Sequence, residues 1–131
     1  MIVGYKLFNQ VGCQQCHVES WTTAKAADRP ELSNQKIRPF TDMLLHDMGE
    51  GLADNRPEFL ADGREWRTAP LWGASLNKVV TGQENYLHDG RARTLEEAIL
   101  WHGGESEAVK QSFMQLKSAE RQQLIHFLES I

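Results

Sequence analysis

The five residues Cys13-Gln14-Gln15-Cys16-His17 constrain this chain more than any other feature. They contain both of its cysteines, and a histidine follows the second one directly. Three kinds of site use such a segment: a redox dithiol, part of a zinc site, or the attachment point of a c-type haem. In the third, each thiol forms a thioether with a haem vinyl group, and the histidine binds the iron.

The zinc and dithiol interpretations fit the sequence less well than haem does. A structural zinc site needs four ligands, and the chain has no second C-x-x-C to complete the set. A thioredoxin-like dithiol follows a strand, whereas the apolar residues before the motif recur at helical spacing. We therefore predict one covalent haem c, attached through Cys13 and Cys16, with His17 as an iron ligand.

Size and charge limit the other possibilities. A chain of 131 residues is the size of one domain, so we predict a single haem domain over residues 1–131. The net charge of −4 does not favour nucleic acid or an anionic membrane as a partner.

No apolar run approaches the roughly 20 residues of a membrane span, and no secretory signal precedes the motif. Because bacteria attach haem c outside the cytoplasm, we expect a periplasmic protein whose signal is missing here, with Met1 starting a shortened chain.

The chain reads as helices separated by long loops. Thr94 and Glu97 form a capping box at the start of one helix, and two glycines end it. Residues 20–40 are polar, and residues 50–93 are rich in glycine, so both are predicted to be loop without a sheet. Helices are predicted at 2–12, from Thr41 or Asp42 to Gly49, and at 94–103, 105–116 and 118–130.

These elements predict an all-α protein. We expect a small c-type cytochrome fold, in which helices and long loops wrap around one haem that serves as part of the core. The first helix should cross the last one closely, because Gly4 has no side chain and lets two backbones approach. Phe8 lies on the same face of that helix.

Several residues are candidates for the sixth ligand of the haem iron. Met114 fits core packing, His126 fits a solvated helix surface, and His46 and Met48 fit either the haem pocket or ordinary packing. His102 ends a helix before two glycines, where a flat cofactor can approach the backbone. From the residues alone, His102 and His88 remain equal candidates. The full set comprises Met43, His46, Met48, His88, His102, Met114 and His126.

Four segments carry a resemblance to a known family. "FTDMLLHDMGEGLAD", "WRTAPLWGASL" and "NYLHDGRARTLEEAILWHGGESEA" occur in that order, followed by "ERQQLIHFLESI". Together with the C-x-x-C-H motif they resemble the C-terminal haem domain of the di-haem oxidoreductases, peroxidase-like relatives of the bacterial di-haem cytochrome c peroxidases. The resemblance runs from about Gly4 to the end of the chain.

The resemblance implies the sixth ligand. In the peroxidases, the helix after the H-D-G-R-like segment ends in a methionine that ligates the C-terminal haem. In a related enzyme that matures a tryptophan-derived cofactor, a tyrosine takes that place. Aligning "TLEEAILWHGG" on this helix places His102 there, which implies a bis-histidine haem held by His17 and His102.

The resemblance also implies roles near the haem for further residues. His88 and Arg91 match the H-D-G-R segment, which lies over the haem edge in the relatives. Arg67 matches a basic residue near the haem pocket. Arg67 and Arg91 either hold haem propionates or form surface ion pairs. Trp72 and Trp101 either flank the porphyrin or stack in the core.

The resemblance also implies a role. The family places peroxide chemistry on its N-terminal haem, while the C-terminal haem receives electrons and passes them on. This chain has one haem motif. It is therefore predicted to be the electron-transfer half of a periplasmic di-haem oxidoreductase, with a second haem domain or a redox protein as partner. The alternatives are an independent small cytochrome c that carries electrons and, less favoured, a mono-haem peroxidase.

Overall fold

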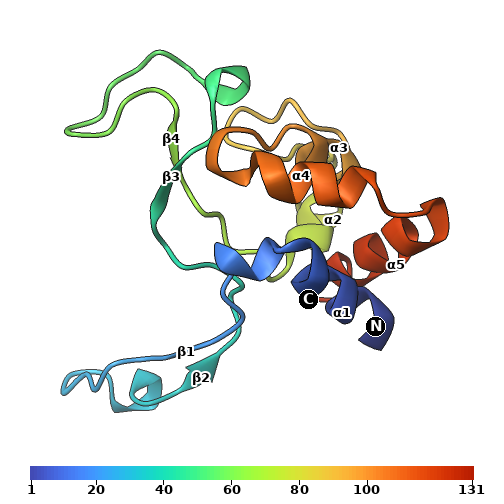
Figure 1. The fold of residues 1–131 in the computed structure, drawn as a ribbon. Helices are drawn as coiled ribbons and strands as arrows, with labels where there is room; N and C mark the ends of the chain where they lie inside the picture. Colours follow the sequence, from blue (N-terminus) through green and yellow to red (C-terminus); the bar gives the residue numbers. More distant parts are fainter.

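The structure is a computed structural model that describes residues 1–131. It contains five α-helices and two small antiparallel sheets (Figure 1). None of the helices has both the length and the apolar composition needed to cross a membrane. The helices are α1 (Ile2–Val11), α2 (Asn77–Thr81), α3 (Leu95–Leu100), α4 (Glu107–Met114) and α5 (Ser118–Leu128). The strands are β1 (Trp21–Thr22), β2 (Lys36–Ile37), β3 (Leu45–Asp47) and β4 (Glu65–Arg67).

The all-α prediction is wrong, because 42% of the chain is helical and 11% is strand. The helix predicted from Thr41 or Asp42 is replaced by β3, which pairs antiparallel with β4. Met43 adopts a left-handed backbone with φ of 63°, which interrupts any helix at this point. The Asp42 carboxylate accepts a hydrogen bond from the Leu44 N–H at 2.9 Å, a local turn that competes with helix formation.

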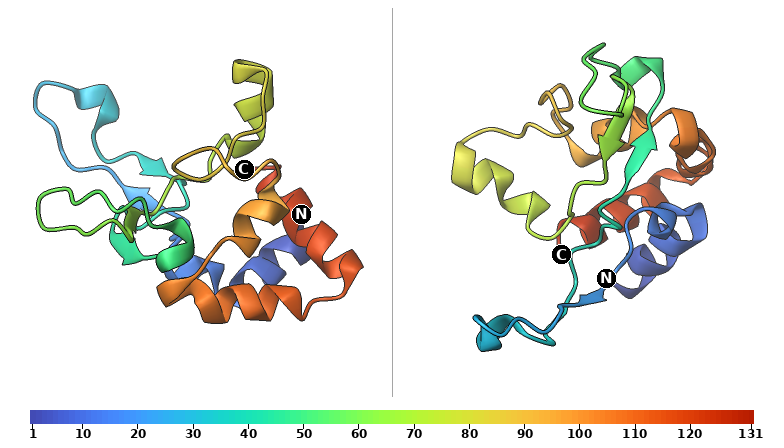
Figure 2. Two further views of the ribbon diagram at one scale, coloured as in Figure 1. Left: turned by 90° about the horizontal axis from the view of Figure 1, so that it is seen from above. Right: turned by 90° about the vertical axis from the view of Figure 1, so that its left-hand side faces the viewer.

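The predicted loop at 20–40 also contains paired strands. Trp21 lies opposite Ile37 in the pair formed by β1 and β2. The Thr23 hydroxyl bonds to the Leu32 carbonyl and accepts from the Gln35 N–H, which closes the segment beyond the strands. This segment extends away from the helices as an arm (Figures 1 and 2). The sheet-free prediction for residues 50–93 is wrong as well, since β4 lies within them.

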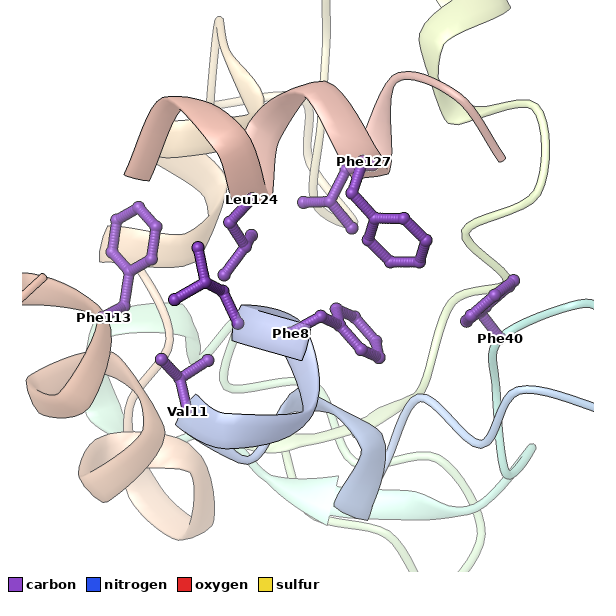
Figure 3. Packing of buried hydrophobic residues seen from close by; sticks show 8 residues of the cluster. Phe8, Val11, Phe40, Phe113, Leu124 and Phe127 are labelled. Atoms are coloured by element: carbon purple, nitrogen blue, oxygen red, sulfur yellow. The ribbon is translucent and has the colours of Figure 1, made fainter. Parts of the chain in front are cut away.

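The apolar core lies where α1 crosses α5 and α4 packs beside them (Figure 3). Phe127 meets Phe8 and Phe40 edge to face, with ring centroids 5.4 Å and 5.8 Å apart. Only 16 of 131 residues are buried, so this core accounts for a small part of the chain. The cluster comprises Leu7, Phe8, Val11, Phe40, Phe113, Leu124, Phe127 and Leu128.

Gly4 permits the close crossing that the sequence predicted. A Cβ atom on Gly4 would overlap the Gln123 carbonyl oxygen and lie 2.6 Å from the Phe127 Cβ. Because that oxygen belongs to the backbone of α5, no side chain can rotate to make room. A methyl group here would force the two helices apart.

We expect Gly4→Ala to lower the free energy of unfolding by about 3 kcal/mol, the upper range for overpacking a core. Gly51→Ala is the matched control, since no atom lies within 4 Å of its added Cβ. It should change stability by less than about 1 kcal/mol. Urea unfolding followed by circular dichroism measures both. An equal loss in the two variants would show that the crossing is not tight.

Candidate haem site

The C-x-x-C-H motif begins where α1 ends. Gly12 adopts a left-handed φ of 104° after the last residue of the helix, and its N–H bonds back to the helix carbonyls. The 3-10 turn Cys13–Gln15 follows at once. The His17 N–H donates to the Cys13 carbonyl at 2.9 Å. The end of one helix and one tight turn therefore fix both thiols and the imidazole together.

His17 is oriented by a backbone carbonyl. Its Nδ1 lies 3.0 Å from the Phe40 carbonyl oxygen, which can only accept, so Nδ1 carries the proton. Nε2 has no hydrogen bond within the protein and holds the free lone pair. Burial lowers the pKa of His17 to about 4, so the ring is neutral at neutral pH. A neutral imidazole with one nitrogen bonded to a carbonyl and the other free is typical of a metal ligand.

Phe40 provides the carbonyl group that orients the His17 ring. Its φ of 54° is left-handed, an uncommon backbone conformation for a bulky residue. Its ring packs edge to face against Phe8 and Phe127 in the core. The core thus fixes the direction of the Phe40 carbonyl. Sequence analysis missed this contribution, because a backbone carbonyl has no residue-type signal.

His102 has the same arrangement as His17. It follows α3, and its Nδ1 donates to the Ala98 carbonyl oxygen at 2.8 Å. The last carbonyls of a helix have no backbone partner beyond the helix, so one is available for this bond. Burial lowers the pKa of His102, so this ring is also neutral with Nε2 free. The pKa of His17 is lowered mainly by burial and to a smaller extent by the charge of His102.

The two glycines after His102 pack against the segment that follows β3. A Cβ on Gly103 would lie 2.9 Å from the Met48 carbonyl oxygen. Gly104 has a φ of 53°, and a Cβ there would overlap the Asp47 carbonyl oxygen. Sequence analysis assigned these glycines to the approach of a flat cofactor. The structure instead shows them in close contact with another segment of backbone.

The two thiols are free and protonated. Burial raises the pKa of Cys13 to about 12. Burial also raises the pKa of Cys16, and the negative charges of Asp42 and Glu105 raise it further. A redox dithiol needs a thiol whose pKa is lowered, so that it reacts as a thiolate. The surroundings of Cys13 and Cys16 therefore disfavour the dithiol interpretation.

His46 forms hydrogen bonds to two carboxylates. From the sequence, it fitted either the haem pocket or ordinary packing. Its Nε2 lies 2.8 Å from Asp42 Oδ2, and its Nδ1 lies 2.9 Å from Glu105 Oε2. The hydrogen bond to Glu105, followed by that to Asp42, raises the pKa of His46. The Cys16 sulfur lies 3.9 Å from Nδ1. Donor atoms of Cys16, Asp42 and His46 lie within 4.8 Å of one another, but carboxylates already engage both ring nitrogens.

The neighbours of His88 are an aromatic ring and a carboxylate. Its ring stacks on Trp66 with centroids 3.5 Å apart and planes inclined by 12°. Trp66 belongs to β4, so His88 packs on one strand of the small sheet that β3 and β4 form. The nearest charged partner of His88 is Asp89, at 4.0 Å. No hydrogen bond connects His88 to His17 or His102.

Arg91 is held by three partners. Its Nε donates to Asp89 at 2.7 Å, and its Nη1 donates to the Gly51 carbonyl oxygen at 2.5 Å. The guanidinium carbon lies 4.8 Å from the ring centroid of Trp101, within the range of a cation–π contact. Arg91 therefore forms the ion pair that was one of its two predicted roles.

Arg67 and Trp72 are less enclosed. Arg67 is exposed, and its guanidinium contacts the Met43 sulfur at 3.6 Å without forming an ion pair with a carboxylate. Trp72 is 51% exposed and lines an open, mostly apolar surface pocket of about 330 Å³ with Val80 and Tyr86. No residue of the C-x-x-C-H motif lines that pocket.

Comparison with known families identifies the chain. A family model described as "di-haem oxidoreductase, putative peroxidase" matches residues 1–131, the whole chain. The chain belongs to this di-haem oxidoreductase family. No match was found among curated proteins or among solved structures. The family resemblance drawn from the sequence segments is confirmed, and membership implies that the protein binds haem.

The residues of this di-haem oxidoreductase fit a haem. His17 and His102 are neutral imidazoles with free Nε2 atoms. The run Met43–Leu45 exposes 51–60% of its three apolar residues and follows Asp42, whose N–H bonds to the Cys16 carbonyl at 2.8 Å. Exposed apolar side chains next to the motif suit the binding of a flat apolar group.

Proposed function

We propose that this chain is the electron-transfer half of a di-haem oxidoreductase and carries one covalent haem c. Thioethers at Cys13 and Cys16 would attach the haem, and His17 and His102 would bind its iron. The observation that carries the proposal is the matched state of the two histidines. Each ring is neutral, each donates Nδ1–H to a backbone carbonyl, and each keeps Nε2 free.

A haem bound in this way supplies one-electron chemistry. His17 and His102 would both bind the iron, and this would leave no open position for peroxide. The carbonyls of Phe40 and Ala98 hold the two rings in orientation and increase their basicity as ligands. These roles favour electron transfer over peroxide reduction at this site.

Arg67 is the better of the two arginines for binding a haem propionate. It forms no ion pair within the chain, whereas Arg91 already binds Asp89 at 2.7 Å. A guanidinium without a carboxylate partner can make the bidentate pair that a propionate accepts. His88 would not bind the iron, since its ring stacks on Trp66.

The partner would be a second haem domain or a redox protein, and the setting would be the periplasm. The family name specifies two haems, while this chain has one C-x-x-C-H motif. The second haem would therefore be bound by residues outside the described chain. The alternative, an independent small cytochrome c, is distinguished by whether a second motif lies in the same reading frame.

We expect the isolated protein, made with the haem-attachment machinery, to be a poor peroxidase. A pyridine haemochrome assay should report one haem c per chain, and the ferric spectrum should be low-spin. Reaction with hydrogen peroxide should be slow compared with the His102→Ala variant, which opens one axial position. Rapid peroxide turnover by the unaltered protein would mean that the axial position is open.

A further inference from the structure

We propose that His46 is a positioning residue, which holds the loop carrying His102 against the segment that follows the C-x-x-C-H motif through its hydrogen bonds to Asp42 and Glu105. This inference rests on the proposed bis-histidine haem. His46 would not touch the iron. Its effect would be on how long His102 stays bound.

One end of the network is fixed to the motif. The Asp42 N–H donates to the Cys16 carbonyl at 2.8 Å, and the Asp42 side chain is only 9% exposed. Its Oδ1 accepts from the Leu44 N–H, which leaves Oδ2 directed to His46 at 2.8 Å. The backbone of Asp42 is therefore tied to Cys16, one of the two residues that would attach the haem.

The other end is fixed to the loop that carries His102. Glu105 lies three residues after His102, and both of its carboxylate oxygens accept hydrogen bonds. Oε2 accepts from His46 Nδ1 at 2.9 Å, and Oε1 accepts from the Asp47 N–H at 3.0 Å. Two successive residues of β3 thus bind one glutamate in a bidentate manner.

The sheet holds His46 between these two ends. His46 lies opposite Trp66 in the antiparallel pair of β3 and β4, which limits movement of its backbone. A doubly protonated imidazole donates from both nitrogens, and here each donor meets a carboxylate. Hydrogen bonds between charged groups are the stronger kind. Removing the ring would leave the loop joined to β3 mainly by Glu105 on Asp47 and by the packing of Gly103 and Gly104.

The rate of cyanide binding measures how firmly His102 is held at the iron. In a six-coordinate haem, cyanide can reach the ferric iron only after His102 leaves it. The rate of cyanide binding to the ferric protein therefore measures how often the loop releases its histidine.

The first experiment compares His46→Ala with His126→Ala in the haem-loaded protein. His126 is an exposed histidine on α5 and serves as the matched control. We expect His46→Ala to bind cyanide about tenfold faster or more, since it loses two charge-assisted hydrogen bonds. Its ferric spectrum should gain a high-spin fraction, while the His126 variant keeps the rate and spectrum of the unaltered protein.

Glu105→Ala is the second variant, and it tests the same network from the surface. The Glu105 side chain is 57% exposed, so its removal should leave the fold intact even if His46→Ala folds poorly. We expect faster cyanide binding than in the unaltered protein. The double variant should be no faster than the faster single variant, because both changes break one network. Multiplied effects in the double variant would contradict this coupling.

The outcomes separate this inference from the proposed function. A low-spin protein whose His46→Ala and Glu105→Ala variants bind cyanide at the unaltered rate would overturn the role of His46 and leave the bis-histidine haem standing. A high-spin spectrum of the unaltered protein would overturn the proposed function, and the role of His46 with it.

Discussion

Replacing both Cys13 and Cys16 with alanine should abolish covalent haem attachment. The two thiols are the only cysteines of the chain, so no other side chain can form a thioether. Acidified solvent should then extract all haem from the double variant. Protein made with the attachment machinery, without the substitutions, should retain its haem through the same extraction. Intact mass spectrometry measures the difference as the presence or absence of haem on the chain.

The single variants are the controls for this experiment. Cys13→Ala and Cys16→Ala each keep one thiol, so each should retain haem through one thioether, though with a lower yield. An unaltered protein that carries no haem by intact mass would refute covalent attachment. A reversible disulfide between the two cysteines under the same conditions would instead support the dithiol interpretation, despite the raised pKa values of both thiols.

Four of the five helices were predictable because their signals are local, whereas α2 lies in residues 50–93, which were predicted to be loop. The Thr94 side chain accepts from the Glu97 N–H at 3.0 Å, as the capping pattern requires. The helices near both ends of the chain occupy most of the ranges expected from their apolar spacing. Gly4 predicted the close approach of α1 and α5, since a residue without a side chain marks such a crossing.

The strands were not predictable from local spacing. In the sequence around His46, apolar residues follow a pattern that fits a short helix as well as a strand. The deciding features are the left-handed backbone of Met43 and the pairing of β3 with β4. The pairing joins residues about twenty positions apart, and tertiary contacts of this kind override a weak local preference.

In the candidate site, the ligand residues were predictable but their contacts were not. Motif and alignment selected His17 and His102, but the carbonyls that orient them cannot be read from residue types. Pattern alone left His88 and His102 equal. In the structure their surroundings differ, because His102 donates to the Ala98 carbonyl, whereas His88 stacks on Trp66. Glu105, one of the two partners of His46, lies 59 residues further along the chain, beyond any local pattern.

His102→Ala should open one axial position of the haem. We expect the ferric spectrum to shift from low spin to high spin, and cyanide and peroxide to bind readily. His102→Met should keep the iron low-spin, since methionine can still ligate it. It should also raise the reduction potential, on the order of 0.1 V within the ~0.8 V range that axial ligands span. A thioether is a softer ligand than imidazole and favours ferrous iron. Spectroscopy and redox titration of the haem-loaded variants measure both effects.

His88→Ala distinguishes the two histidines that the sequence left equal. In the structure the His88 ring covers Trp66, so its loss should leave the iron six-coordinate and the ferric spectrum low-spin. The reduction potential should change far less than in His102→Met, because both iron ligands remain. A high-spin His88 variant beside an unchanged His102 variant would identify His88 as the ligand. It would also mean that α3 and its final histidine are misaligned with the ligand-bearing helix of the relatives.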